Sequence, residues 1–289
     1  YITGSNARLL SGELATHLTG RYITIPVYPL SFDEYQRHHR AQGTTDSTDQ
    51  LFSRYMMFGG MPGLFVTGQP DQDRATEILT SIYESIVLKD VAGRYGIRDI
   101  ATLEKLSRYL FSTSGNLFSV NNVANTLASA GANASYATVD NQISALERSF
   151  IVYSAQQERM RGKELLRPQR KFYPVDNGFR NLATGFNGSD RGAQLEGIVF
   201  MELQRRGYDV TIGSLPDGEI DFIAKRGNDK QYIQVTLNMT EEQTRERELA
   251  PLRRLGDAFP RTVLTLDWHS EGMTDEGIHI TNVMDWLCS

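Results

Sequence analysis

Three polar side chains, those of Glu196, Asp221 and Gln234, stand where they could share one site. The stretch GAQLEGIVFMELQRRG, at 192–207, has the apolar spacing of an amphipathic helix and contains Glu196. The stretches GEIDFIA and YIQV have the composition of short strands, and they contain Asp221 and Gln234. Carboxylate and amide oxygens are ligands for Mg²⁺. These residue types on one helix and two strands are candidates for a single polar site.

This order of residues and elements resembles the metal-dependent nucleases of the PD-(D/E)XK type. Those enzymes place a glutamate on a first helix, an aspartate in a second strand and a Glu-x-Lys in the third. The resemblance implies that two carboxylates, here Glu196 and Asp221, hold Mg²⁺ beside Gln234 and that a lysine steadies the attacking water or the phosphate. The sequence departs from the pattern at Gln234, which is neutral, and at Thr236, which takes the place of the lysine. Such a site binds Mg²⁺ more weakly and stabilises the transition state less.

Two interpretations of this region remain open. In the first, the domain keeps the nuclease fold with little or no cleavage, and Lys225 or Lys230 reaches the site from a neighbouring strand or loop. In the second, Asp221 only ends a hydrogen-bond network and Glu196 is a solvated charge on its helix. In either case Glu219 points to the same face of its strand as Asp221, because side chains two residues apart in a strand share a face.

The region 97–175 has the pattern of three helices followed by two short strands. The helices are indicated by TLEKLSRYLFSTSG, SVNNVANTLASAG and SYATVDNQISALERSF, and the strands by IVY and KFY. This order is typical of a winged helix-turn-helix, a DNA-binding fold. The residues expected at DNA are Tyr136, Thr138, Asn141 and Gln142 on the third helix and Arg159, Arg161 and Lys163 in the wing, with Arg167, Arg170 and Lys171 close by. The alternative is that the wing packs between neighbouring domains and its charges form a solvated face.

The N-terminal stretch has a strand–helix–strand pattern. Apolar residues at helical spacing follow Asn6, and YITIPV at 22–27 alternates as a strand does. From Ser31 the pattern is helical to about residue 96, which indicates a connector bundle. The pair His38-His39 in this bundle points apart on a helix, so we expect both histidines at the surface and no metal site there.

Taken together, the motifs resemble a widespread prokaryotic family of AAA-type ATPases whose C-terminal half is a domain of unknown function with a PD-(D/E)XK nuclease-like fold. They are ITGSNARLLSGELATHLTGRYITIPVYPLSFDEY, FGGMPGLF, SIYESIVLKDV, KFYPVDNGFRN, QLEGIVFMELQRRGYDV, GEIDFIA and YIQV. The resemblance implies that ITGSN is the sensor 1 strand, that Asn6 senses the γ-phosphate of ATP and that Arg21 reaches a nucleotide. Without that role, Asn6 is a helix N-cap and Arg21 a charge at a strand start.

In that family the Walker A and Walker B motifs lie upstream of the sensor 1 strand. No GxxxxGK[ST] occurs in this chain. The chain therefore looks N-terminally truncated, and we expect it not to hydrolyse ATP by itself.

Composition excludes several classes of protein. A net charge of −5 argues against a chain that coats nucleic acid indiscriminately. The single cysteine, Cys288, cannot form an internal disulfide. No stretch approaches the roughly 18 apolar residues of a membrane span. We expect a cytoplasmic protein with no membrane partner.

We expect a multidomain α/β protein. Its parts are a remnant of the AAA+ ATPase sheet at 1–30, a helical connector at 31–96, a winged-helix-like domain at 97–175 and a restriction-endonuclease-like mixed α/β domain at 176–289. Its expected function is that of the C-terminal portion of an ATP-binding protein that acts on DNA or a protein partner. ATP and Mg²⁺ would be cofactors of the complete protein, which could form oligomers through its ATPase domain. The alternatives are an ATP-independent DNA-binding module and a weak metal-dependent DNA nuclease.

Overall fold

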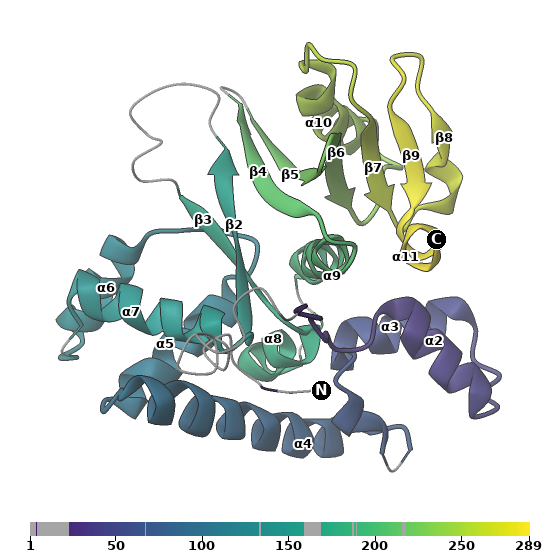
Figure 1. Cartoon of the computed structure of the whole chain (residues 1–289). Helices are drawn as coiled ribbons and strands as arrows, with labels where there is room; N and C mark the ends of the chain where they lie inside the picture. Colours follow the sequence, from purple (N-terminus) through teal and green to yellow (C-terminus); the bar gives the residue numbers. More distant parts are fainter. Residues whose placement is uncertain are drawn as a thin grey trace.

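The structure is a computed structural model that describes Gly4 and residues 23–66, 68–132, 134–158, 169–186, 188, 190–215 and 218–289. Among these residues ten α-helices lie around one nine-stranded sheet (Figure 1). The predicted α/β class is confirmed at this level. The predicted site residues Asn6, Arg21, Arg159, Arg161 and Lys163 lie outside the described residues, and so do the predicted first strand and the helix after it.

All nine strands belong to one mixed sheet in the order β1-β3-β2-β4-β5-β6-β7-β9-β8. The strands are β1 (Leu117–Phe118), β2 (Val152–Glu158), β3 (Arg170–Pro174), β4 (Asp209–Leu215), β5 (Gly218–Arg226), β6 (Asp229–Thr236), β7 (Arg261–Thr265), β8 (Gly272–Met273) and β9 (His279–Asn282). The pairs β2–β4, β6–β7 and β7–β9 are parallel, and the other neighbours are antiparallel.

The β2–β3 hairpin is joined to the C-terminal strands through β4. Gln156 on β2 lies opposite Thr211 on β4 in a parallel register. The predicted border between residues 175 and 176 therefore lies within one continuous sheet. This connection is what brings side chains of β3 next to those of the C-terminal region.

The α-helices lie beside the strands that come first in the chain, β1 to β3, and also beside the later strands (Figure 1). They are α2 (Phe32–Ala41), α3 (Thr48–Phe58), α4 (Gln72–Ser85), α5 (Ile100–Ser112), α6 (Val120–Ser129), α7 (Tyr136–Arg148), α8 (Asn177–Thr184), α9 (Arg191–Arg205), α10 (Glu242–Arg253) and α11 (Val283–Cys288). Shorter helical segments are η2 (Pro62–Phe65), the π-helical η3 (Ile86–Gly93) and η5 (Trp268–Ser270). The helix α4 is continued directly by the π-helical segment η3.

Side-chain caps define where several helices begin. Ser31 and Glu34 form a capping box at α2, in which each side chain bonds the other residue's backbone N–H. Ser119 and Ser135 are the N-caps of α6 and α7, and they accept hydrogen bonds from backbone N–H groups in the first turns of these helices. Each serine thus satisfies a backbone donor that has no partner within its helix.

The strand predicted at 22–27 is absent from the described part of that segment. Residues 23–27 belong to no strand, and the side chains of Ile23, Ile25 and Val27 are 90%, 75% and 92% exposed. A strand persists only where its backbone groups bond to a neighbouring strand. The prediction of a strand here is wrong for residues 23–27.

His39 lies in the aromatic core of the helical connector, and its predicted surface position is wrong. It is 4% exposed and packs edge-on against Tyr35 and Phe65. Gln69 Nε2 lies 2.9 Å from its Nδ1. Burial lowers the pKa of His39, with the nearby positive groups His38 and Arg54 adding to the effect. The imidazole therefore serves as a packed ring in this core.

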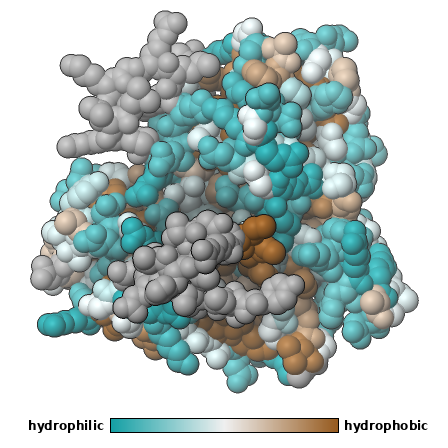
Figure 2. Space-filling view, viewed as in Figure 1, coloured by the Kyte–Doolittle hydropathy of each residue, from teal (hydrophilic) through white to brown (hydrophobic). Residues whose placement is uncertain are grey.

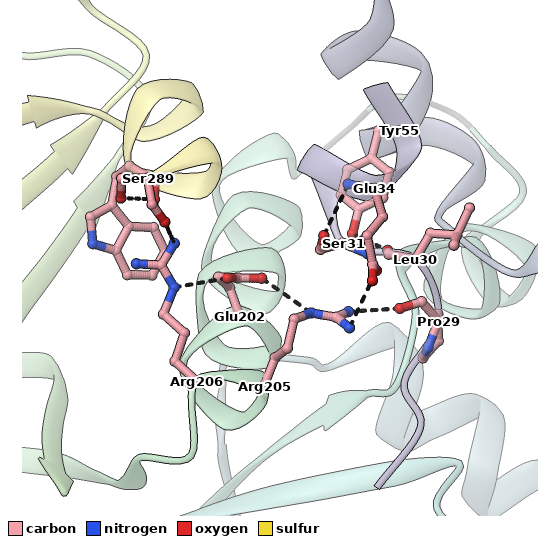
Figure 3. Close-up of polar contacts among 10 residues, drawn as sticks. Pro29, Leu30, Ser31, Glu34, Tyr55, Glu202, Arg205, Arg206 and Ser289 are labelled. Carbon is pink, nitrogen blue, oxygen red and sulfur yellow. Dashed lines mark hydrogen bonds and ion pairs between the residues drawn. The ribbon is translucent and has the colours of Figure 1, made fainter. Parts of the chain in front are cut away.

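The C-terminal end of α9 holds both the segment before α2 and the last helix (Figure 3). Arg205 donates a hydrogen bond to the carbonyl of Pro29 at 2.7 Å. Arg206 donates to the carbonyl of Trp286 at 2.6 Å and lies over its ring. Glu202 accepts from both arginines, at 3.2 and 2.8 Å. These contacts attach residues 23–31 and α11 to the centre of the fold.

The face seen in Figure 2 is mainly hydrophilic, with hydrophobic patches in its lower part. Among the described residues, no helix combines the length and the apolarity needed to cross a lipid bilayer.

Candidate functional site

A cleft of about 710 Å³ lies where α9, β5, β6 and α10 meet. Glu196 enters it from α9, Asp221 from β5 and Gln234 from β6. Glu219 and Glu248 also line it. The structure thus brings the three residues of the predicted nuclease-like site into one acidic pocket, while their roles in catalysis and metal binding stay predictions.

A buried lysine from outside the predicted site reaches this pocket. Lys171 lies on β3 and is 5% exposed. Its Nζ donates to Glu196 Oε1 at 3.3 Å and forms an ion pair with Glu219. Tyr173, on the same face of β3, donates its hydroxyl to the same Glu196 oxygen at 2.7 Å. The hairpin that was predicted as a DNA-binding wing therefore holds the pocket's glutamate.

Gly115, in the turn between α5 and β1, also lies against Glu196. Its φ is +81°, and a Cβ at this position would lie 3.1 Å from Glu196 Oε2. Both the backbone conformation and the lack of space favour glycine. The carboxylate is thus enclosed by the turn on one side and by β3 on the other.

The electrostatics of the pocket follow from three carboxylates around one ammonium group. Burial raises the pKa of Asp221 well above its ordinary value, and the charge of Glu196 adds to this while Lys171 opposes it. Burial also raises the pKa of Glu196, although Lys171 and Tyr173 favour its charged form. Burial alone would lower the pKa of Lys171, but Glu196, Glu219 and Asp221 outweigh it and the pKa is raised. The raised pKa values mean that Glu196 and Asp221 take up protons more readily than they would in water.

Gln234 is buried and uses both ends of its side-chain amide. Its Oε1 accepts a hydrogen bond from the N–H of Asp221 at 3.3 Å, and its Nε2 donates to Glu248 Oε2 at 3.0 Å. Asp221 Oδ2 in turn accepts from the N–H of Val235 at 2.8 Å. A carboxylate at position 234 would face Glu248 directly, so the neutral amide has a structural reason.

We expect Gln234→Glu to destabilise the protein by about 2 kcal/mol at pH 8. The substitution replaces the donor to Glu248 with a like charge. Urea unfolding at pH 8 tests this, with Gln231→Glu, at a half-buried position of the same strand, as the control. Equal effects of the two substitutions would contradict the account.

The lysines suggested from sequence as substitutes in the site lie elsewhere. Lys225 pairs with Glu158 at 2.7 Å, and Lys230 pairs with Asp257 at 3.2 Å. The lysine that contacts Glu196 is Lys171, whereas we expected Lys225 or Lys230 to reach the site. It comes from a strand more than 20 residues before the first residue of the predicted site.

The side chains of this pocket do not fit a metal ion held by protein carboxylates. Across the described ranges, no three His, Cys, Asp or Glu side chains are grouped so that they could hold an ion. The ammonium group of Lys171 contacts Glu196 and Glu219 directly. Asp221 uses one oxygen to accept a backbone hydrogen bond.

The third helix of the 97–175 region, α7, carries the other predicted surface. Tyr136 is 52% exposed and Asn141 is also exposed, so both are open to a partner. Thr138 is half-buried, and its hydroxyl lies 2.9 Å from Ser135 Oγ at the helix start. Gln142 is buried against the body of the protein. Only part of the predicted base-reading set therefore faces outwards.

Arg170, grouped with the wing from sequence, has acidic partners within the fold. It lies 3.4 Å from Asp140 and from Glu147, both on α7. Its guanidinium also lies over the ring of Phe172. Arg170 and Lys171 therefore bind the hairpin to its surroundings instead of projecting as free cations.

The fold and pocket define a mixed α/β protein with a buried lysine–carboxylate cluster, and comparison with known proteins places it further. An uncharacterized protein of Haemophilus influenzae is 38% identical over 286 residues, which is 99% of this chain and 70% of that relative. The chain belongs to the same protein family as this relative. An uncharacterized protein of Methanocaldococcus jannaschii is 28% identical over 260 residues, covering 86% of this chain and 57% of that protein.

Two family models match parts of the chain. Residues 49–190 match a domain of unknown function (DUF8612), and residues 1–36 match an AAA domain. No solved structure matches the chain. The residues that line the pocket lie beyond the DUF8612 match, whereas Lys171, which contacts Glu196, lies inside it.

Proposed function

We propose that this chain is the C-terminal effector portion of an AAA-type ATP-binding protein. The AAA domain match at residues 1–36 carries the proposal. A second observation supports it, because Ile23, Ile25 and Val27 alternate as in a strand yet are almost fully exposed. An ATPase sheet to which this segment added a strand would bury these side chains.

Two residues would serve nucleotide chemistry in the complete protein. By the family resemblance, Asn6 senses the γ-phosphate of ATP, and Arg21 stabilises developing charge on a nucleotide. The segment after them is tied to the body, since Arg205 bonds the carbonyl of Pro29 and Tyr55 bonds that of Leu30 at 2.9 Å (Figure 3). A movement of the ATPase sheet would therefore reach α9 through this segment.

The effector portion would contact DNA through α7. The element order α5–β1–α6–α7–β2–β3, with β1 paired to β3 and β3 to β2, supports the winged-helix interpretation. Tyr136 and Asn141 are the two predicted base-reading residues that are exposed. The wing residues Arg159, Arg161 and Lys163 would bind phosphates.

The pocket at Glu196, Asp221 and Gln234 would be a nuclease-like site that does not cut. Its support is the placement of these residues on α9, on β5 and on the next strand β6, in the order of the nuclease pattern. The neutral Gln234 and the ammonium of Lys171 replace groups on which cleavage depends. A protein partner in place of DNA is the alternative outcome of the experiment below.

Fluorescence anisotropy of a labelled DNA duplex tests the DNA contact with this chain alone. We expect Tyr136→Ala combined with Asn141→Ala to weaken binding about tenfold, on the scale of one side chain that reads a base. Trp268→Ala, an equally exposed aromatic residue on η5 near the other end of the sheet, is the matched control and should bind as wild type does. Replacing Arg159, Arg161 and Lys163 with alanine should reduce the salt slope by about 0.9 for each phosphate that the variant no longer neutralises. Undetectable binding at low salt would overturn the DNA contact and leave a protein partner.

A further inference from the structure

The buried ammonium group of Lys171 contacts two carboxylates that line the acidic pocket. The side chain of Lys171 is 6% exposed. It contacts Glu196 at 3.3 Å and pairs with Glu219, while the charge of Asp221 also acts on it. A lysine so deeply buried is rare unless it is paired. Here its two carboxylate partners come from separate elements, Glu196 from α9 and Glu219 from β5.

We propose that Lys171, which contacts Glu196 and Glu219 at this pocket, is its resident cation and takes the place of the divalent metal ion expected at Glu196 and Asp221. With Lys171 in position, the pocket then binds no divalent ion. The inference concerns the pocket alone and does not depend on DNA contact or on ATP. It would hold even if the chain acts on a protein.

Charge and space both favour one cation over two. In the nuclease pattern, a third carboxylate would add one more negative charge to the site. In this chain the corresponding residue is the neutral Gln234. Its side-chain amide accepts a hydrogen bond from the N–H of Asp221 and donates one to Glu248. Mg²⁺ requires oxygen ligands at about 2.0–2.1 Å in a near-octahedral set. Glu196 Oε1 already accepts from both Lys171 and Tyr173. An added divalent ion would meet the ammonium group at close range and repel it.

The three departures from the nuclease pattern then have one explanation. An amide, Gln234, replaces a carboxylate, and Thr236 replaces the expected lysine. A different lysine, Lys171 on β3, contacts the glutamate of the site. Thr236 is buried, and its hydroxyl donates to the carbonyl of Asn238 at 3.2 Å, so this position takes no part in the charge cluster. The changes keep a cation beside Glu196 while removing the need for a metal ion.

The competing interpretation is that Lys171 steadies a phosphate next to a bound metal ion. The two interpretations differ in what removal of Lys171 does. If Lys171 stands in for the metal, its removal opens a divalent-ion site. If it assists a metal, wild-type protein already binds the ion.

Thermal unfolding with and without Mn²⁺ tests the proposal on the wild-type chain and three variants. We expect 1 mM Mn²⁺ to leave the Tm of wild type unchanged and to raise that of Lys171→Gln by about 5 °C. The shift should vanish in Lys171→Gln combined with Asp221→Asn. Lys225→Gln, which removes a lysine paired at the surface, is the matched control and should show no shift.

Electron paramagnetic resonance of Mn²⁺ with wild-type protein covers the case in which Lys171→Gln does not fold. The proposal expects all added Mn²⁺ to remain free at tens of micromolar protein. Binding by wild type that Asp221→Asn abolishes would overturn it. So would a folded Lys171→Gln variant whose Tm does not respond to Mn²⁺.

Discussion

Replacing Asp176 with alanine is expected to destabilise the protein by about 4 kcal/mol at pH 5, because two buried backbone donors lose their partner. Asp176 is the N-cap of α8 and is 6% exposed. Its carboxylate accepts hydrogen bonds from the N–H of Gly60 at 2.6 Å and of Gly178 at 2.8 Å. It thereby links the turn after α3 to a helix more than 110 residues later. Gly59 must be glycine here, since a Cβ would overlap the Asp176 carboxylate.

The same residue predicts a defined pH dependence. Burial raises the pKa of Asp176 to about 6, although both backbone hydrogen bonds favour the charged form. The unfolded chain has the lower, ordinary pKa, so this group's contribution to stability is complete below that value and is lost as pH rises through about 6. Between pH 5 and pH 8 the loss amounts to about 1.4 kcal/mol. The effect of Asp176→Ala should be smaller at pH 8 by this amount.

Urea unfolding of wild type and Asp176→Ala at pH 5 and pH 8 measures both quantities. Asp209→Ala, at an exposed position on β4, is the control and should change stability by less than about 0.5 kcal/mol. A difference between wild type and Asp176→Ala that is the same at both pH values would contradict the assigned pKa. A difference below about 1 kcal/mol at both would contradict the link itself.

Replacing Lys171 with methionine is expected to cost about 4 kcal/mol at pH 8, because buried carboxylates lose the cation that they contact. The pKa values of Glu196 and Asp221 are already raised, and loss of the ammonium raises them further. Groups with raised pKa values stabilise the fold at low pH and lose this contribution as pH increases. The variant should therefore recover much of its stability towards pH 5.

Chemical unfolding across this pH range separates the charge effect from simple loss of packing. Lys225→Met is the control, because it removes a partly exposed ion pair worth at most about 1 kcal/mol. A loss for Lys171→Met that stays constant between pH 5 and pH 8 would mean that packing, not charge, explains the role of Lys171.

The central site could be predicted from sequence because its residues lie on elements that are close together along the chain. Glu196, Asp221 and Gln234 follow one another on α9, β5 and β6, and a helix with adjacent strands leaves few alternatives for their placement. The strand pattern also shows correctly that Asp221 and Glu219 share a face, since both line the pocket. The spacing of these residues along the chain was therefore enough to predict that they line one pocket.

Lys171 could not be predicted by the same reasoning. Its position depends on the parallel pairing of β2 with β4, which joins segments about 55 residues apart and has no local signal. A weak signal does exist, because KFYP places a lysine inside an otherwise buried strand. Such a lysine requires a buried acidic partner. The six basic residues near the wing suggested a phosphate surface instead, and the acidic partners of Arg170 and Lys171 show why charge counting alone misleads.

Two predictions for the N-terminal part of the chain, the surface position of His39 and the strand at 22–27, were wrong for similar reasons. His39 is polar by type, yet its ring fills a gap between Tyr35 and Phe65. The stretch at 22–27 has the alternation of a strand, but alternation cannot supply the neighbouring strand that must bond to it. Both cases depend on contacts that are distant in sequence.

Hydrolysis of ATP by the full-length protein that contains this chain tests the central proposal most directly. The account predicts that the full-length protein hydrolyses ATP, that this chain alone does not, and that Asn6→Ala lowers the turnover of the full-length protein by about 100-fold. Addition of duplex DNA should stimulate hydrolysis, and Tyr136→Ala combined with Asn141→Ala should remove the stimulation. A folded full-length protein without ATP hydrolysis, with and without DNA, would contradict the account.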